Sequence, residues 1–232
     1  MKDAGTLFDE YAEAYEQALS NAIAVSGEDR EYFAEGRVAW LARCLREAKE
    51  TPRTLLDFGC GDGATTPLLL AALKAESAVG IDVSAKSLEI ARKRFATAQI
   101  KYELIGEFQA SGQADLAYCN GVFHHILPGQ RTEALRLVSG ALRAGGLFSF
   151  WENNPWSLAT RYVMSRCAFD RNAITLTPPG ACSLLRAGGF EILRKDFRFI
   201  FPRALRALRK IEDFVYRVPL GAQYQILCRK MQ

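Results

Sequence analysis

The sequence has few of the residues that mark membrane, disulfide-bonded or metal-binding proteins. No apolar run approaches the roughly 18 residues that cross a bilayer, and the mean hydropathy is −0.05, so we expect no transmembrane helix. The six cysteines are scattered without a C-x-x-C pair, which predicts free thiols and no zinc site. Only two histidines occur, His124 and His125, and we predict no metal site.

Charge is also limited, since the net charge is only +4 over 232 residues. We therefore expect no nucleic-acid partner. The N-terminal stretch MKDAGTLFDEYAEAY lacks the apolar centre of a signal peptide, which predicts a cytoplasmic protein. A hydrophobic content of 49% suits one globular unit with a sizeable core.

The stretch TLLDFGCGDG, residues 54–63, organises the chain. Leu55, Leu56 and Phe58 form a short apolar run of strand length, and alternating glycines follow it. An Ala- and Leu-rich helix is predicted over residues 64–73. A strand, a glycine turn and a helix form the first unit of a nucleotide-binding α/β fold. Asp57 is unusual, because a carboxylate at the end of a buried strand requires a partner such as a cationic ligand group.

Two cofactor families fit this turn. Gly59-x-Gly61-x-x-Ala64 satisfies the dinucleotide fingerprint and leaves an NAD-dependent oxidoreductase as an alternative. The longer pattern D-x-G-x-G-x-G, which includes Asp57, resembles the first motif of class I S-adenosylmethionine-dependent methyltransferases. The resemblance implies that Asp57 lies near the amino group of the cofactor. It also implies that Gly59, Cys60 and Gly61 lie against the methionine part and the ribose.

The order of the predicted elements agrees with that family. Strands are expected at 77–83, 99–105, 114–120 and 147–151, with helices at 84–95 and 130–142. We predict a doubly wound, Rossmann-like, seven-stranded α/β sheet that ends in an antiparallel hairpin. Residues 51–232 would form the methyltransferase domain and residues 1–50 an N-terminal helical lid. The resemblance implies that Tyr11 or Tyr15 of this lid covers the cofactor.

Further cofactor contacts follow from the resemblance. Asp82 ends the second strand, where a carboxylate binds ribose hydroxyls, and Val83 would lie near the adenine. The other expected cofactor contacts follow the third and fourth strands: Gly106, Glu107, Phe108, Asn120 and Gly121.

The two histidines follow the fourth strand in N-G-V-F-H-H-I, a segment that resembles the family's sulfonium-proximal loop. By their ordinary pKa they are the candidates for a general base near neutral pH. An alternative is that alignment alone suffices, because a sulfonium is already a good electrophile.

Candidate acceptor residues lie in the C-terminal third. Glu152, Asn153 and Asn154 follow the fifth strand, and a turn is an equal alternative role for them. A strand with Phe197, Phe199 and Phe201 on one face is predicted over 190–201, then a basic amphipathic helix over 203–217 and a last strand over 222–229. Arg203 and Arg206 of that helix would meet an anionic acceptor or partner, or else form a solvated face.

We therefore predict S-adenosylmethionine-dependent methyl transfer to an oxygen or nitrogen of a small-molecule acceptor. Two alternatives stay open: an NAD-dependent oxidoreductase, and a non-catalytic cofactor-binding protein on the same fold.

Overall fold

A computed structural model describes residues 22–167, 170 and 173–231, and it contains one seven-stranded sheet within them. Residues 1–21, and with them the predicted lid tyrosines Tyr11 and Tyr15, lie outside the described residues. The elements, in chain order, are η1 (Ala24–Ser26), α3 (Arg30–Ala48), β1 (Thr54–Phe58), α4 (Thr65–Leu73), β2 (Ser77–Asp82), α5 (Ala85–Phe95), β3 (Ile100–Leu104), β4 (Ala114–Asn120), η2 (Pro128–Gln130), α6 (Arg131–Ala141), β5 (Leu142–Asn153), α7 (Leu158–Arg166), α8 (Pro178–Ala187), β6 (Phe190–Arg198), η4 (Arg203–Leu208), α9 (Arg209–Val215) and β7 (Gln223–Lys230).

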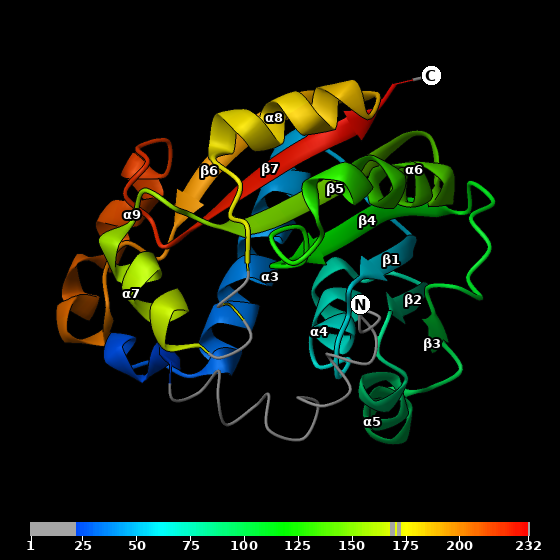
Figure 1. Ribbon diagram of the computed structural model, residues 1–232, viewed down its shortest axis with the longest axis horizontal. Coiled ribbons are helices and arrows are strands. Elements are labelled where there is room, and N and C mark those ends of the chain that lie inside the picture. Colours follow the sequence, from blue (N-terminus) through cyan, green and yellow to red (C-terminus); the bar gives the residue numbers. More distant parts are fainter. Residues whose placement is uncertain (1–21, 168–169, 171–172, 232) are drawn as a thin grey trace.

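The sheet has the strand order β3-β2-β1-β4-β5-β7-β6, which confirms the predicted doubly wound topology (Figure 1). The first five strands pair in parallel. β7 runs antiparallel to both β5 and β6 and completes the predicted terminal hairpin. The strand order reverses between β1 and β4, and ligands bind beside such a switch point, at the carboxyl ends of the strands.

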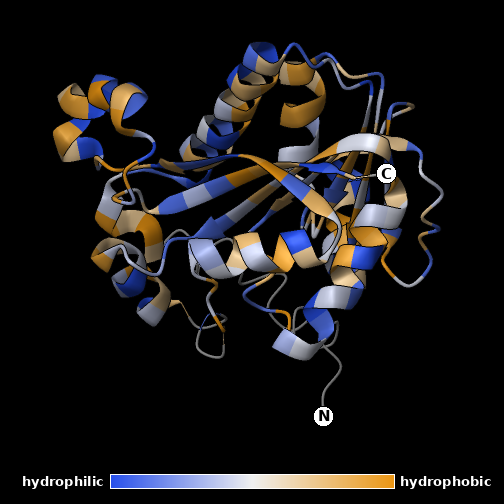
Figure 2. Ribbon diagram, turned by 90° about the horizontal axis from the view of Figure 1, so that it is seen from above, coloured by the Kyte–Doolittle hydropathy of each residue, from blue (hydrophilic) through white to orange (hydrophobic). Residues whose placement is uncertain are grey.

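Two apolar cores cover the two faces of the sheet. The alternating side chains of β1 show why, since Leu56 and Phe58 pack with α6 and α8 while Leu55 packs with α3, α4 and α5. Figure 2 shows helices on both sides of the sheet. α3 contributes Trp40 and Leu41 to the core, although its residues belong to the stretch assigned to the lid.

None of the helices in the described part of the chain has the length and apolarity that a bilayer crossing requires.

The long strand predicted over residues 190–201 is shorter in the structure. β6 ends at Arg198, and Phe199 adopts a left-handed φ of 63°, so the expected one-faced alternation of Phe197, Phe199 and Phe201 is wrong. The cause is Glu212, whose buried carboxylate accepts the backbone N–H groups of residues 199–201 at 3.2, 3.0 and 2.9 Å.

The basic helix predicted over residues 203–217 is also divided. Residues 203–208 form the 3-10 helix η4, and only Arg209–Val215 is α-helical. Leu205 has non-helical angles (φ −109°, ψ 23°) and breaks the continuous face that the residue spacing predicted.

Candidate functional site

A cavity of about 1580 Å³ opens at the carboxyl ends of β1, β2 and β4. It extends from the glycine turn after β1 to α7 and to the segment after β6. Single-ligand pockets commonly measure about 300–1,000 Å³. The cavity is therefore large enough for a nucleotide-like cofactor and a second molecule side by side.

The glycine turn forms the cofactor half of the cavity. Gly59, Gly61 and Gly63 all have left-handed φ angles, of 72°, 54° and 77°. The N–H groups of Gly59 and Cys60 donate to the carbonyl of Ile81 at 2.8 and 3.1 Å and hold the turn against β2. A Cβ at Gly61 would meet nothing within 4 Å, so the backbone there lies open to a ligand.

Asp57 lines the cavity although it is only 3% exposed. The Thr66 hydroxyl donates to its carboxylate at 2.7 Å. Burial raises the pKa of Asp57 to about 7, because the hydrogen bond from Thr66 and the charge of Arg37 offset only part of the lost hydration of the carboxylate. A cationic ligand group would stabilise the ionised carboxylate, as expected for the amino group of S-adenosylmethionine.

Asp82 closes the cofactor half from β2. Its carboxylate accepts the N–H of Gly61 at 2.8 Å and the N–H of Ser84 at 2.9 Å. These bonds fix its orientation beside the cavity, and Val83 lines the cavity next to it. From β4, the buried Oδ1 of Asn120 faces the same cavity with no hydrogen-bond partner among the described residues. A ligand donor would satisfy this oxygen.

The structure separates the residues expected after β3. Gly106 lines the cavity and is open to a ligand, since a Cβ there would meet nothing within 4 Å. Glu107 is exposed and outside the cavity lining, and Phe108 packs against the core. Gly121 lines the cavity with a φ of 67°.

The histidines both line the cavity, but their environments differ. Nδ1 of His124 lies 2.6 Å from the Glu152 carboxylate. Burial lowers the pKa of His124, but the carboxylates of Glu152 and Asp170 more than offset this and raise it to about 10. Burial, followed by the charge of His124, lowers the pKa of His125 to about 4. Neither value suits a general base at neutral pH.

The acceptor candidates after β5 lie in different places. Asn153 lines the cavity. Glu152 is buried beneath it and accepts the N–H of Phe123 at 2.8 Å as well as holding His124. Asn154 lies outside the cavity lining and is fully buried in a turn, donating to the carbonyl of Gly221 at 2.8 Å. Arg203 and Arg206 are exposed and lie outside the cavity lining.

Arg37 is the main pocket residue that the sequence reasoning missed. Arg37 is 5% exposed, and within the described part of the chain its guanidinium donates to two neutral groups, the Tyr118 hydroxyl at 3.2 Å and Oε1 of Gln223 at 3.0 Å. No carboxylate of the described residues forms a direct ion pair with it, although its charge lowers the pKa of Asp57. A signal existed in the sequence, because Arg37 lies four residues after Phe33 and four before Leu41, on the apolar face of α3.

Gln223 and Phe199 complete the acceptor half. Gln223 accepts from Arg37 and donates to Asn153 at 3.2 Å, so three polar side chains from α3, β7 and β5 are linked. The ring of Phe199 packs against Phe33 with centroids 5.0 Å apart and forms an aromatic wall. Gln223 and Phe199 carry no local motif, and only the tertiary fold brings them to the cavity.

Comparison with known proteins agrees with this geometry. Residues 56–148 match a family model described as a methyltransferase domain. A trans-aconitate 2-methyltransferase from Rhizobium etli is 38% identical over 96 residues, which cover 41% of this chain and 37% of that protein. A second trans-aconitate 2-methyltransferase, from Rhodopseudomonas palustris, is 29% identical over 119 residues, which cover 51% of this chain and 46% of that protein. The chain therefore matches less than half the length of either relative.

Solved structures share the fold over nearly the whole chain. An S-adenosylmethionine-dependent methyltransferase from Thermotoga maritima has a TM-score of 0.66 at 18% identity, covering 97% of this chain and 99% of its own. Human N-acetylserotonin methyltransferase in complex with S-adenosylmethionine has a TM-score of 0.64 at 19% identity, covering 99% of this chain and 60% of its own. These findings favour S-adenosylmethionine over NAD as the cofactor.

Proposed function

We propose that the chain is a class I S-adenosylmethionine-dependent methyltransferase that transfers a methyl group to a carboxylate oxygen of a small polycarboxylate. The observation that carries the acceptor class is Arg37, a buried cation at the cavity that donates to two neutral groups and forms no direct ion pair among the described residues. A buried charge is stabilised by an opposite charge and by charge-assisted hydrogen bonds. A carboxylate of the acceptor would supply both.

The cofactor fits the residues of the glycine-turn half. Asp57 would meet its ammonium, Asp82 its ribose hydroxyls and Asn120 a donor of the bound molecule. When bound, S-adenosylmethionine supplies a methyl group on a sulfonium. The open backbone at Gly61 and Gly106 leaves room for such a ligand beside the turn.

A carboxylate acceptor agrees with the histidine environments. A carboxylate oxygen is already a deprotonated nucleophile at neutral pH, so methyl transfer to it requires no general base. The protein then needs only to align the acceptor with the methyl group. Such alignment can lower the activation barrier by about 7–11 kcal/mol in favourable cases. Arg37, Gln223 and Asn153 form a linked polar row that can orient a planar carboxylate.

The names of the sequence relatives point the same way. Two of them are trans-aconitate 2-methyltransferases, whose named acceptor carries several carboxylates. The overlap with these proteins is confined to about half of this chain or less, so the acceptor half of the pocket is the part that has to be tested directly.

The test is methyl transfer from labelled S-adenosylmethionine to a panel of mono-, di- and tricarboxylates, each paired with its amide. We expect turnover with one or more polycarboxylates and none with the matching amides. Equal turnover of acids and amides would contradict the proposal. If S-adenosylhomocysteine binds but no acceptor of the panel is methylated, the non-catalytic alternative is favoured.

A further inference from the structure

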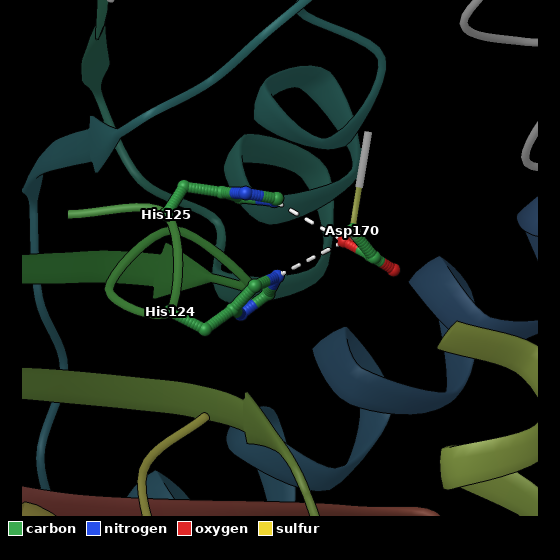
Figure 3. Close-up of side chains that lie close together, drawn as sticks. All are labelled: His124, His125 and Asp170. Carbon is green, nitrogen blue, oxygen red and sulfur yellow. Dashed lines mark ion pairs between the residues drawn. The ribbon is translucent and has the colours of Figure 1, made fainter. Parts of the chain in front are cut away.

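Three potential metal ligands converge at the acceptor side of the cavity. Nε2 of His124 and Nε2 of His125 each lie 3.4 Å from Oδ1 of Asp170, and all three atoms lie within 4.8 Å of one another. Figure 3 shows the two rings, from the segment after β4, and the carboxylate directed toward one point. The sequence could not show this, because Asp170 lies far along the chain from the histidines.

The separations suit a tetrahedral metal ion. Zinc bonds to imidazole nitrogen and carboxylate oxygen are about 2.0–2.2 Å long, so two ligand atoms of a tetrahedral site lie roughly 3.4 Å apart. Both nitrogen-to-oxygen distances have this value. The two imidazole nitrogens lie within 4.8 Å of each other, so an ion bound between the three atoms would draw the rings together by at most about 1.4 Å.

Outer contacts hold His124 in the orientation that a ligand requires. Its Nδ1 faces Glu152 at 2.6 Å, so the opposite nitrogen points at Asp170. Glu152 is itself fixed by the N–H of Phe123. Metal-binding histidines characteristically donate their other N–H to a carboxylate in this way, and that contact sets which nitrogen is available to the metal.

Asp170 supplies a second, independent observation. Its side chain is 8% exposed, and its buried Oδ1 accepts no hydrogen bond of good geometry among the described residues; the two imidazole nitrogens at 3.4 Å are its nearest polar neighbours in ion-pair contact. A buried carboxylate oxygen without a donor is unfavourable, and a cation between it and the two imidazoles would satisfy it. All three residues line the cavity, so a fourth coordination position would open toward the acceptor.

We propose that His124, His125 and Asp170 bind one divalent transition-metal ion of the zinc type. Two imidazole nitrogens favour such an ion over Mg²⁺ or Ca²⁺, which prefer oxygen ligands. The open position would take an oxygen of a ligand in the acceptor half. The ligand geometry stands independently of the acceptor proposed above, and metal binding can be measured without methyl transfer.

The experiment titrates metal-free full-length protein with Co²⁺, which reports tetrahedral coordination by its visible absorption, and then displaces it with Zn²⁺. We expect one equivalent of Co²⁺ with the intense bands of a tetrahedral site, and loss of these bands in Asp170→Ala and in His125→Gln. Asp213→Ala, an exposed aspartate of α9, is the matched control and should bind like the wild type. Circular dichroism on each variant establishes that it is folded.

Two results would overturn the metal site. One is no stoichiometric Co²⁺ binding by the wild type, as expected if a protonated His124 simply bridges Glu152 and Asp170. The other is a thiolate-to-cobalt charge-transfer band that persists in Asp170→Ala, which would place the ion on cysteines. Failure of the carboxylate panel would leave both results unchanged, so the two proposals fail separately.

Discussion

Asp57 shows how one buried carboxylate makes stability depend on pH. Its folded pKa of about 7 lies above the ordinary value of 3.8, so the folded state resists ionisation. The contribution of Asp57 to stability is therefore greatest below pH 4, falls as pH rises toward 7 and then levels. The total loss is roughly 4 kcal/mol at most, at about 1.4 kcal/mol per pKa unit.

Replacement of Asp57 with Asn should remove that loss. Urea unfolding between pH 4 and 8 should show Asp57→Asn gaining stability relative to the wild type as pH rises. The difference in unfolding free energy between the two proteins reports on Asp57 alone, because His125 titrates in the same pH range in both and its contribution cancels. A constant difference across the range would mean that Asp57 keeps an ordinary pKa.

Asp115 provides a control of opposite sign. Burial raises its pKa, but Arg143 and the N–H groups of Arg53 and Thr54 lower it to about 2. Its contribution is therefore present above pH 4 and lost only as pH falls toward 2. Asp115→Asn should leave the slope between pH 4 and 7 unaltered.

Arg37 is the residue on which the acceptor class depends. Arg37→Met keeps an apolar stem in the core but removes the charge and its hydrogen bonds. A lost charge-assisted contact of about 1.5–3 kcal/mol predicts a rise of roughly 10- to 150-fold in KM for the carboxylate acceptor. Steady-state kinetics measure this change, and calorimetry with S-adenosylhomocysteine should show unchanged affinity. If cofactor affinity falls instead, the guanidinium binds the cofactor's own carboxylate.

At the scale of elements, substitutions at two glycines of the turn after β1 should affect different properties, cofactor binding at Gly61 and folding stability at Gly59. A Cβ at Gly61 meets open space, whereas a Cβ at Gly59 would lie 2.3 Å from the Val122 side chain. Gly61→Ala should cost only the left-handed backbone penalty of about 1–2 kcal/mol, or a few degrees in Tm. Its methyl group would project into the cofactor half and weaken S-adenosylhomocysteine binding at least tenfold.

Gly59→Ala is the paired variant. It should lose considerably more stability than Gly61→Ala, because the clash with Val122 adds to the backbone strain. Thermal unfolding and calorimetry on both variants measure the contrast. Wild-type cofactor affinity in Gly61→Ala would show that no ligand approaches the backbone there.

The elements that the sequence predicted well are those with local signals. β4 has the predicted bounds, and Asp29, Ser84 and Ser157 cap helices through side-chain bonds to the backbone. The segments after β6 were predicted poorly, because their backbone is set by the distant carboxylate of Glu212 rather than by their own spacing.

The residues of the site also fall into those with a local sequence signal and those without one. The glycine turn, Asp57, Asp82 and Asn120 belong to contiguous motifs at strand ends, and the structure places all of them at one cavity. Arg37, Gln223, Phe199 and Asp170 reach that cavity from α3, β7 and two loops. No sequence spacing relates them, so the acceptor half was visible only after the chain had folded.

At the scale of the whole molecule, the exposed cations of η4 and α9 lie beside the cavity without lining it. Arg203 follows Phe201 and Pro202, which do line the cavity. Its guanidinium and that of Arg206 are exposed, so direct acceptor contact is not their role in this conformation. A positive rim can still raise the encounter rate of an anionic acceptor through long-range attraction.

Charge reversal to Glu at Arg203, Arg206 and Lys210 tests this attraction. The expected result is a lower kcat/KM for an anionic acceptor at low salt, unchanged kcat, and a difference that shrinks as salt shortens the Debye length to about 8 Å near 0.15 M. The control is a second triple variant with Glu at the exposed Lys49, Lys74 and Lys101, which changes the net charge by the same amount. Lys49 and Lys74 precede the amino ends of β1 and β2, away from the cavity. Equal kinetics for the two triple variants would mean that the rim acts only through net charge, and a lower kcat in the first would instead indicate a contact with the bound acceptor.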